Sequence, residues 1–231
     1  MLRVNQLNGF GAGGGRPGPY SMSYAGRNLS SGVTRTVSFD IGPYYSDRIV
    51  FIGAVSGLSQ GITSCSVNGA ACTKIGGATS YSVREFWRVV APPGEGSVPI
   101  TVNWAASTSS LFAVWVLGGG AGLNPVFDVA SAAGNNTNSA TANFSTPGAV
   151  NDFTLMLGSK PMASVGAFDG LNTDLDNPNT SFVGVSYNGG GCGGGFIGPN
   201  ITYEASVYVQ AYGSDSSKPI NVLAIKFGKA P

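Results

Sequence analysis

Short apolar or alternating runs, each ended by Gly, Pro or Asn, follow one another from Val33 to Phe227. Val37, Phe39 and Ile41 alternate with polar residues at a period of two, which is typical of a strand with one buried face. No stretch of helical length shows an apolar period of 3.6 residues. The 36 Gly and 13 Pro residues punctuate the backbone between the runs. The pattern therefore predicts an all-β chain.

The expected strands share short length and apolar or alternating composition, and they are residues 33–41, 48–55, 62–67, 81–91, 98–104, 111–117, 137–144, 152–157, 182–187, 201–211 and 220–227. The run from Arg48 to Val55 is almost continuously apolar, which is typical of a central strand covered on both faces. We expect 137–144 and 152–157 to pair around the turn Thr146-Pro147-Gly148-Ala149. Regular short strands with such turns predict an antiparallel, jelly-roll-like β-sandwich over residues 32–231.

Residues 1–31 have a different character, because they are rich in Gly and Pro and show no apolar period of 2 or 3.6. Such a segment cannot bury enough apolar surface to fold alone. We expect a Gly-rich extended N-terminal arm. Its Phe10, Tyr20, Met22 and Tyr24 are the side chains that we expect to contact a neighbouring molecule.

The charge of the chain is low, with 12 basic and 11 acidic residues and a formal net charge of +1. Charged residues make up 10% of the sequence, whereas about 25% is usual. The absence of basic blocks argues against nucleic-acid binding, which needs several Lys or Arg on phosphates. A free soluble protein normally carries more charge to avoid association. The low charge favours a protein packed against other molecules over an ordinary neutral β-domain.

The sequence contains no histidine, which excludes Ser-His-Asp and Cys-His catalysis and the commonest zinc ligand. The glutamates form no recognisable acid–base pair. Glu85 stands between Arg84 and Arg88, which is typical of a solvated face with weak ion pairs. We therefore expect no enzymatic activity and no cofactor.

The densest group of oxygen ligands lies near residue 170, where Asp169, Asp174 and Asp176 alternate with Asn and Gly. Ca²⁺ binds six to eight oxygens, so these three carboxylates are a candidate calcium site. The spacing of an EF-hand and its closing Glu are absent. A polar loop of turn-forming residues is the favoured interpretation.

Between Cys65 and Cys72 lies Asn68-Gly69, a dipeptide that is favoured at the centre of a type I′ hairpin. A two-residue hairpin there places the two cysteines opposite each other, with Cα atoms about 5.5 Å apart and within reach of a disulfide. The cytoplasm keeps such thiols reduced, so two small buried apolar residues are the favoured interpretation. Cys192 lies in the Gly-rich segment 189–195, which we expect to be a loop.

No apolar core of a signal peptide follows the first six residues, and the longest apolar run, Leu111–Leu117, has seven residues. A membrane-spanning helix needs about 20. We therefore expect no secretory signal and no membrane insertion, and synthesis in the cytoplasm.

An ordered series of motifs runs from Arg48 to Lys160: RIVFI, ITSCSVNGAACT, VVAPPG, VPITV, VWVLG and PVFDVAS. In this order they resemble a β-sandwich module of tailed-bacteriophage and prophage structural proteins. The opening LNGFG is similar to the start of short phage virion proteins. The resemblance implies a virion component without enzymatic activity, either a head decoration or spike protein or a tail subunit. It also implies contacts with other virion proteins and with copies of the chain itself, and no catalytic residue.

The aromatic residues suggest an alternative function, a lectin-like carbohydrate-binding module that attaches to host-surface glycans. Exposed aromatic rings in a row would form its sugar platform. Trp104 and Trp115 lie in apolar runs, so a place in the core is favoured for both.

Overall fold

The computed structural model describes residues 21–56, 60–80, 82–107, 110–118, 128–134, 139–146, 152–160, 170–173, 181–187, 190–197, 208–212 and 219–227. These residues form seventeen strands and no helix, which confirms the all-β prediction. Within them, no helix is long and apolar enough to cross a membrane. All the strand pairs are antiparallel, and the strands form four sheets.

The first half of the chain builds two of these sheets. The N-terminal inner sheet contains, in spatial order, β1 (Ser21–Ser30), β9 (Ser110–Gly118), β3 (Ile49–Ser56), β7 (Ser82–Val90) and β6 (Thr73–Ser80). The N-terminal outer sheet contains β2 (Thr34–Asp40), β8 (Ser97–Trp104), β4 (Ile62–Val67) and β5 (Ala70–Ala71). When the edge strand β6 is set aside, this is the strand order of a jelly roll.

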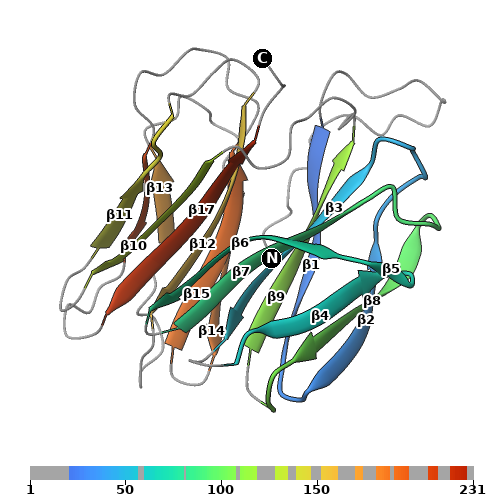
Figure 1. Cartoon of the computed structure of the whole chain (residues 1–231), viewed down its shortest axis with the longest axis horizontal. Coiled ribbons are helices and arrows are strands. Elements are labelled where there is room, and N and C mark those ends of the chain that lie inside the picture. Colours follow the sequence, from blue (N-terminus) through green and yellow to red (C-terminus); the bar gives the residue numbers. More distant parts are fainter. Residues whose placement is uncertain are drawn as a thin grey trace, which may run out of the picture.

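The second half builds the other two sheets. The C-terminal inner sheet contains β10 (Asp128–Gly134), β17 (Ile220–Phe227), β12 (Phe153–Lys160), β15 (Gly190–Ile197) and β14 (Ser181–Tyr187). The C-terminal outer sheet contains β11 (Ser139–Asn143), β16 (Tyr208–Tyr212) and β13 (Gly170–Thr173). Figure 1 shows the two halves side by side, with the second half, coloured yellow to red, on the left.

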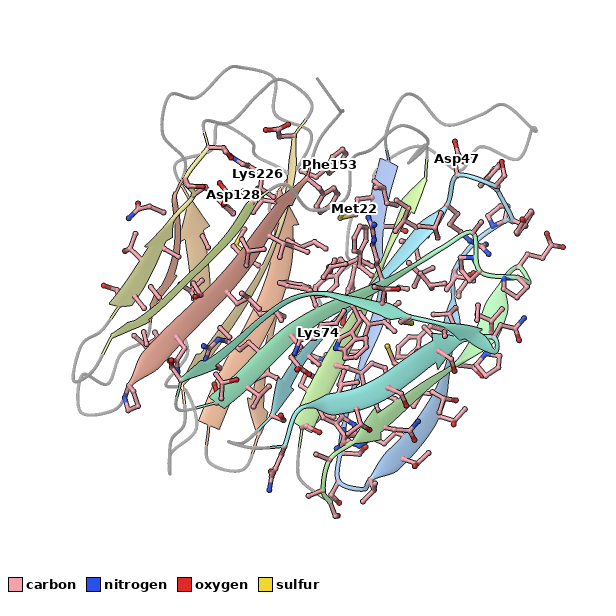
Figure 2. All side chains as sticks on the ribbon, viewed as in Figure 1. Met22, Asp47, Lys74, Asp128, Phe153 and Lys226 are labelled. Carbon is pink, nitrogen blue, oxygen red and sulfur yellow. The ribbon has the colours of Figure 1, made fainter. Side chains whose placement is uncertain are left out.

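Three apolar cores separate the four sheets, so the sheets form successive layers. One core lies between the N-terminal outer and inner sheets and contains Ile52, Ile100 and Val114. The middle core joins the two inner sheets. Figure 2 shows Met22 of β1 near Phe153 of β12, two members of this core. The third core lies between the two C-terminal sheets. The inner strands β3, β9 and β17 are consequently buried along their whole length.

The two halves repeat the same topology. The inner-sheet order β1-β9-β3-β7-β6 corresponds strand by strand to β10-β17-β12-β15-β14, and β2-β8-β4 corresponds to β11-β16-β13. The register is also repeated, because Ile49 pairs with Leu117 in the first half and Phe153 pairs with Phe227 in the second. The chain is therefore a tandem duplication of one jelly-roll unit, whose inner sheets face each other. Positions related in this way are called equivalent below.

Most of the expected strands are present, but the expected hairpin of 137–144 with 152–157 is wrong. Strand β11 pairs with β16 in the outer sheet, whereas β12 pairs with β15 and β17 in the inner sheet. The two strands thus lie in different layers: β11 buries one face in the third core, whereas β12 is buried between the middle core and the third core. The Gly-rich segment expected as a loop also differs, since Gly190–Ile197 is strand β15 between β12 and β14.

Part of the segment that the sequence predicts to be an N-terminal arm is a strand. Residues 21–30, inside the expected arm, form strand β1, which pairs with β9 along its whole length. Met22 is 4% exposed in the middle core, and Tyr24 packs against that core. Met22 and Tyr24 alternate with Ser23, so this short period of two was the signal for a strand. Phe10 and Tyr20 lie outside the described residues.

Candidate functional site

The outward face of the N-terminal outer sheet is polar, with one charged strand residue, Asp40, at the end of β2 and an uncharged area over the rest of its strands. We call this uncharged area the hydroxyl face, and it consists of Thr34, Thr36, Ser38, Ser64, Ser66, Thr101 and Asn103. Cross-strand hydrogen bonds connect its side chains: Thr34 Oγ1 donates to Asn103 Oδ1 at 2.8 Å, and the hydroxyls of Thr36 and Thr101 are 2.9 Å apart. Asn103 Nδ2 donates to Ser64 Oγ at 2.9 Å. The face is therefore an ordered row of neutral donors and acceptors across three strands.

The strict alternation of the strands produces this face. In β8, Val98, Ile100 and Val102 point into the core, and the residues between them point outward. Arg35 is the exception on β2, because it is 6% exposed on the core side. Its guanidinium donates to the carbonyl oxygen of Ser110 at 2.8 Å and lies over the Trp104 ring. Burial lowers the pKa of Arg35.

Seven charged side chains in the described part of the chain are buried: Arg35, Arg48, Arg84, Glu85, Asp128, Asp152 and Lys226. Arg48 is an example of a buried charge that is stabilised by hydrogen bonds to backbone carbonyls. Its guanidinium donates to five carbonyl oxygens of two loops, those of Ile41, Gly42, Pro43, Pro92 and Gly94. A charge in this position holds the two loops together.

Glu85 is not on a solvated face, which corrects the sequence-based expectation. It is 4% exposed, and its carboxylate forms an ion pair with Lys74 on the neighbouring strand β6. The same carboxylate accepts a hydrogen bond of 2.7 Å from the backbone N–H of Ile62 at the start of β4. Glu85 therefore ties the inner sheet to the outer sheet of its own half, and it acts as a structural group.

Asp128 and Lys226 form a second buried network, in the C-terminal inner sheet (Figure 2). Thr146 donates to the Asp128 carboxylate from its backbone N–H and from its hydroxyl, both at 2.7 Å, and Ser145 donates from its hydroxyl. Lys226 Nζ donates to the carbonyl oxygen of Thr146. Burial alone would raise the pKa of Asp128, but the hydrogen bonds and Lys226 outweigh it and lower the pKa.

The two hairpin cysteines lie where the sequence predicts them. Asn68 and Gly69 have φ angles of 46° and 83°, Val67 pairs with Ala70, and the N–H of Cys72 donates to the carbonyl oxygen of Cys65 at 2.9 Å. Both cysteines are free thiols. A hydrogen bond with Cys72, together with burial, raises the pKa of Cys65. Cys192 lies on β15 and pairs in register with Ser159.

The calcium candidates Asp169, Asp174 and Asp176 lie outside the described residues. The segment between the first two is strand β13 of the C-terminal outer sheet. Among the described residues, no group of three His, Cys, Asp or Glu is close enough to hold a metal ion.

Trp104 and Trp115 lie in the core, 2% and 0% exposed, as the apolar runs around them predict. Tyr44 is the one aromatic residue among the exposed large apolar side chains of the described residues. The side chains that the structure describes therefore form no exposed row of rings, and they give the carbohydrate-binding alternative no support. Tyr24 contacts Trp115, and burial raises the pKa of its phenol to about 12.

Comparison with known proteins identifies no relative: no family model, no curated protein and no solved structure matches this chain.

Proposed function

We propose that this chain is a non-enzymatic structural component of a tailed-phage virion, a capsid decoration or spike protein or a tail subunit, that works through protein–protein packing. The observation that carries the proposal is the hydroxyl face, a neutral surface whose side chains are ordered by hydrogen bonds. Seven of the charged side chains are instead buried inside the described part of the molecule. Charged residues are depleted at the centres of protein interfaces, because they lose their hydration there. A neutral polar face avoids this cost.

The duplication supports the same role. The outward positions Thr34, Thr36 and Ser38 of β2 are equivalent to Ser139, Thr141 and Asn143 of β11, so both outer sheets carry hydroxyl or amide side chains at these positions. The two outer sheets lie at opposite ends of the four-layer stack. One molecule can therefore contact two neighbours, and many weak contacts of this kind add up in a symmetric assembly.

The fold and the motif order add support by analogy. Jelly rolls occur in viral capsid domains and also in lectins. Because one fold serves many functions, the fold itself does not choose between these roles. The order of motifs from Arg48 to Lys160 resembles phage structural modules, and this favours the virion over the lectin.

The proposal is tested by counting the chain in purified virions by mass spectrometry with isotope-labelled standard peptides. A copy number fixed at a multiple of the particle symmetry is expected. The variant Thr36→Lys with Thr101→Lys places two charges on the hydroxyl face and should lower incorporation. Thr79→Lys, an exposed substitution on the edge strand β6, is the matched control and should not. Absence of the chain from the particles, or equal incorporation of both variants, would overturn the proposal.

A further inference from the structure

Two thiol groups face each other across the hairpin that joins β4 to β5. Ser66 pairs with Ala71, so Cys65 and Cys72 are the next opposed residues of the two strands. The N–H of Cys72 donates to the carbonyl oxygen of Cys65 at 2.9 Å. Opposed residues of an antiparallel pair project from the same face, with Cα atoms about 5.5 Å apart where their backbones are hydrogen-bonded. A disulfide spans this separation.

Both side chains lie on the core side of the N-terminal outer sheet. Cys65 is 5% exposed in the core between the two N-terminal sheets, and the partly buried Cys72 packs against the same core. A hydrogen bond with the Cys72 thiol, together with burial, raises the pKa of Cys65. The two thiols therefore lie side by side. Cys65 is held in its protonated form, and Cys72 is the thiol that a reagent in solution can reach.

The repeated unit does not require a cysteine at position 65. The equivalent position in the second half is Leu171, because Cys65 pairs with Val102 of β8 as Leu171 pairs with Ala211 of β16. The same place in the topology is thus compatible with an aliphatic residue. A thiol at this position adds a reactivity that the packing of the strand does not need.

Cys72 lies where the chain leaves the outer sheet for the inner sheet. Strand β5 is two residues long and forms an edge of the outer sheet, and β6 of the inner sheet begins at Thr73. Two register pairs and the N–H of Cys72 hold this part of the chain on β4. A covalent bond between the two cysteines would fasten the crossover between the sheets to β4.

We propose that Cys65 and Cys72 form a reversible redox site, a dithiol that small disulfides such as oxidised glutathione convert to a disulfide. The thiolate of Cys72 attacks one sulfur of the oxidant, which gives a mixed disulfide and releases one glutathione. The sulfur of Cys65 then attacks the sulfur of Cys72, its proton passes to solvent, and the second glutathione leaves. Two cysteine thiols are oxidised, and one glutathione disulfide is reduced to two thiols. The site is independent of the proposed virion role.

The link should be easily reversed. Opposed residues of a ladder have Cβ atoms about 4.5–5.5 Å apart, whereas a disulfide prefers about 3.5–4.5 Å. Its formation must draw the two strands together, and strained or accessible disulfides are the ones that are readily reduced. We therefore expect the dithiol in a reducing compartment and the disulfide in oxidising surroundings. In the oxidised form the crossover should open less readily.

The test equilibrates the full-length protein with mixtures of reduced and oxidised glutathione, quenches with acid and alkylates the remaining thiols. Mass spectrometry of the unreduced peptides should identify a link between Cys65 and Cys72 in excess oxidised glutathione, and its loss in excess reduced glutathione. Cys192→Ser is the matched control and should form the link to the same extent. Absence of the link in the folded protein would overturn the proposal, and so would a link that persists in excess reduced glutathione.

Single-cysteine variants separate the roles of the two thiols. Cys65→Ala should accumulate glutathione on Cys72, because the thiol that resolves the mixed disulfide is missing. In Cys72→Ala, glutathione should attach to Cys65 more slowly, by about tenfold or more. Equal rates in the two variants would contradict the order of attack. If either variant does not fold, the titration of the wild type decides.

Thermal unfolding tests the effect of the link on the crossover. Oxidation should raise the Tm of the wild type and of Cys192→Ser, since the closed ring restrains the unfolded chain. It should leave the Tm of Cys72→Ala unchanged. A wild-type Tm that is the same in both redox states would contradict the covalent restraint of the crossover.

Discussion

Gly53 and Leu157 occupy equivalent positions in the two halves, and they meet between the inner sheets. A Cβ atom added to Gly53 would lie 3.1 Å from Leu157 Cδ2, 2.8 Å from Trp115 Cζ3 and 3.0 Å from Phe86 Cε1. Leu157 of one inner sheet therefore packs into the space that the missing side chain of Gly53 leaves in the other. This pairing of a small with a large residue lets the two inner sheets pack closely.

We predict that Gly53→Ala destabilises the protein by about 1–3 kcal/mol, because the added methyl group must displace packed rings. Urea unfolding measures the change. Ser38→Ala, an exposed substitution on the hydroxyl face, is the control and should stay within about 0.5 kcal/mol. Leu157→Ala should cost less in the Gly53→Ala background than in the wild type, because it removes one of the side chains that the added methyl group meets. Equal stability of Gly53→Ala and the wild type would contradict the close approach of the sheets.

Arg48→Met should cost at least about 3 kcal/mol, because several carbonyl oxygens lose their donor at once in a buried place. The control is Arg88→Met, since Arg88 is only partly buried and makes no hydrogen bond in the described residues. The free energy of unfolding in urea is the measurement. A loss no larger than that of Arg88→Met would show that the loop contacts of Arg48 contribute little.

Asp128 should make the free energy of unfolding depend on pH in the acid range. Its pKa in the folded protein is lower than the ordinary value of about 3.9. The stabilisation is therefore fully present above that ordinary value and is lost as the pH falls through the lowered pKa. Asp128→Asn should cost about 1.5–3 kcal/mol at pH 7, and the difference from wild type should shrink toward acid pH.

The measurement for Asp128 is urea unfolding at a series of pH values, with Asp40→Asn as an exposed control. A difference between wild type and Asp128→Asn that is constant down to the lowest pH would contradict the role given to its hydrogen bonds.

Cys65 should be the less reactive of the two hairpin thiols. It is 5% exposed, and the hydrogen bond with Cys72 and burial both raise its pKa, so it stays protonated at neutral pH. The thiolate is the reactive form. Alkylation by iodoacetamide, followed peptide by peptide with mass spectrometry, should be slower at Cys65 than at Cys72 by about tenfold or more. In urea the two rates should converge, and equal rates in the native protein would contradict the prediction.

Patterns of apolar and polar residues within single strands predicted which faces of those strands are buried. The alternation in β2 and β8 gave the outward hydroxyl rows, and the apolar run of β3 gave a strand buried on both faces. The Asn68-Gly69 hairpin is also local, because the positive φ angles are a property of that dipeptide.

The parts that depend on partners in other strands were not predictable in this way. Strand β15 is rich in glycine, and its pairing with β12 and β14 outweighs the low strand propensity of glycine. Glu85 is buried because Lys74 of another strand pairs with it. The repeated topology cannot be recognised in the sequence, because equivalent positions carry residues of different chemistry. Arg84 of β7, for example, is equivalent to Cys192 of β15.

The face-to-face contact of the two inner sheets is tested most directly by a disulfide between them. The hydroxyl oxygens of Ser82 and Ser159 are 2.7 Å apart, so cysteines at both positions are within bonding reach. In Ser82→Cys with Ser159→Cys, mild oxidation should give an intramolecular link, identified by mass spectrometry of the joined peptides. The pair Ser38→Cys with Ser131→Cys, in two separate layers, should give none. Failure of the first pair to link in the folded protein would contradict the four-layer arrangement.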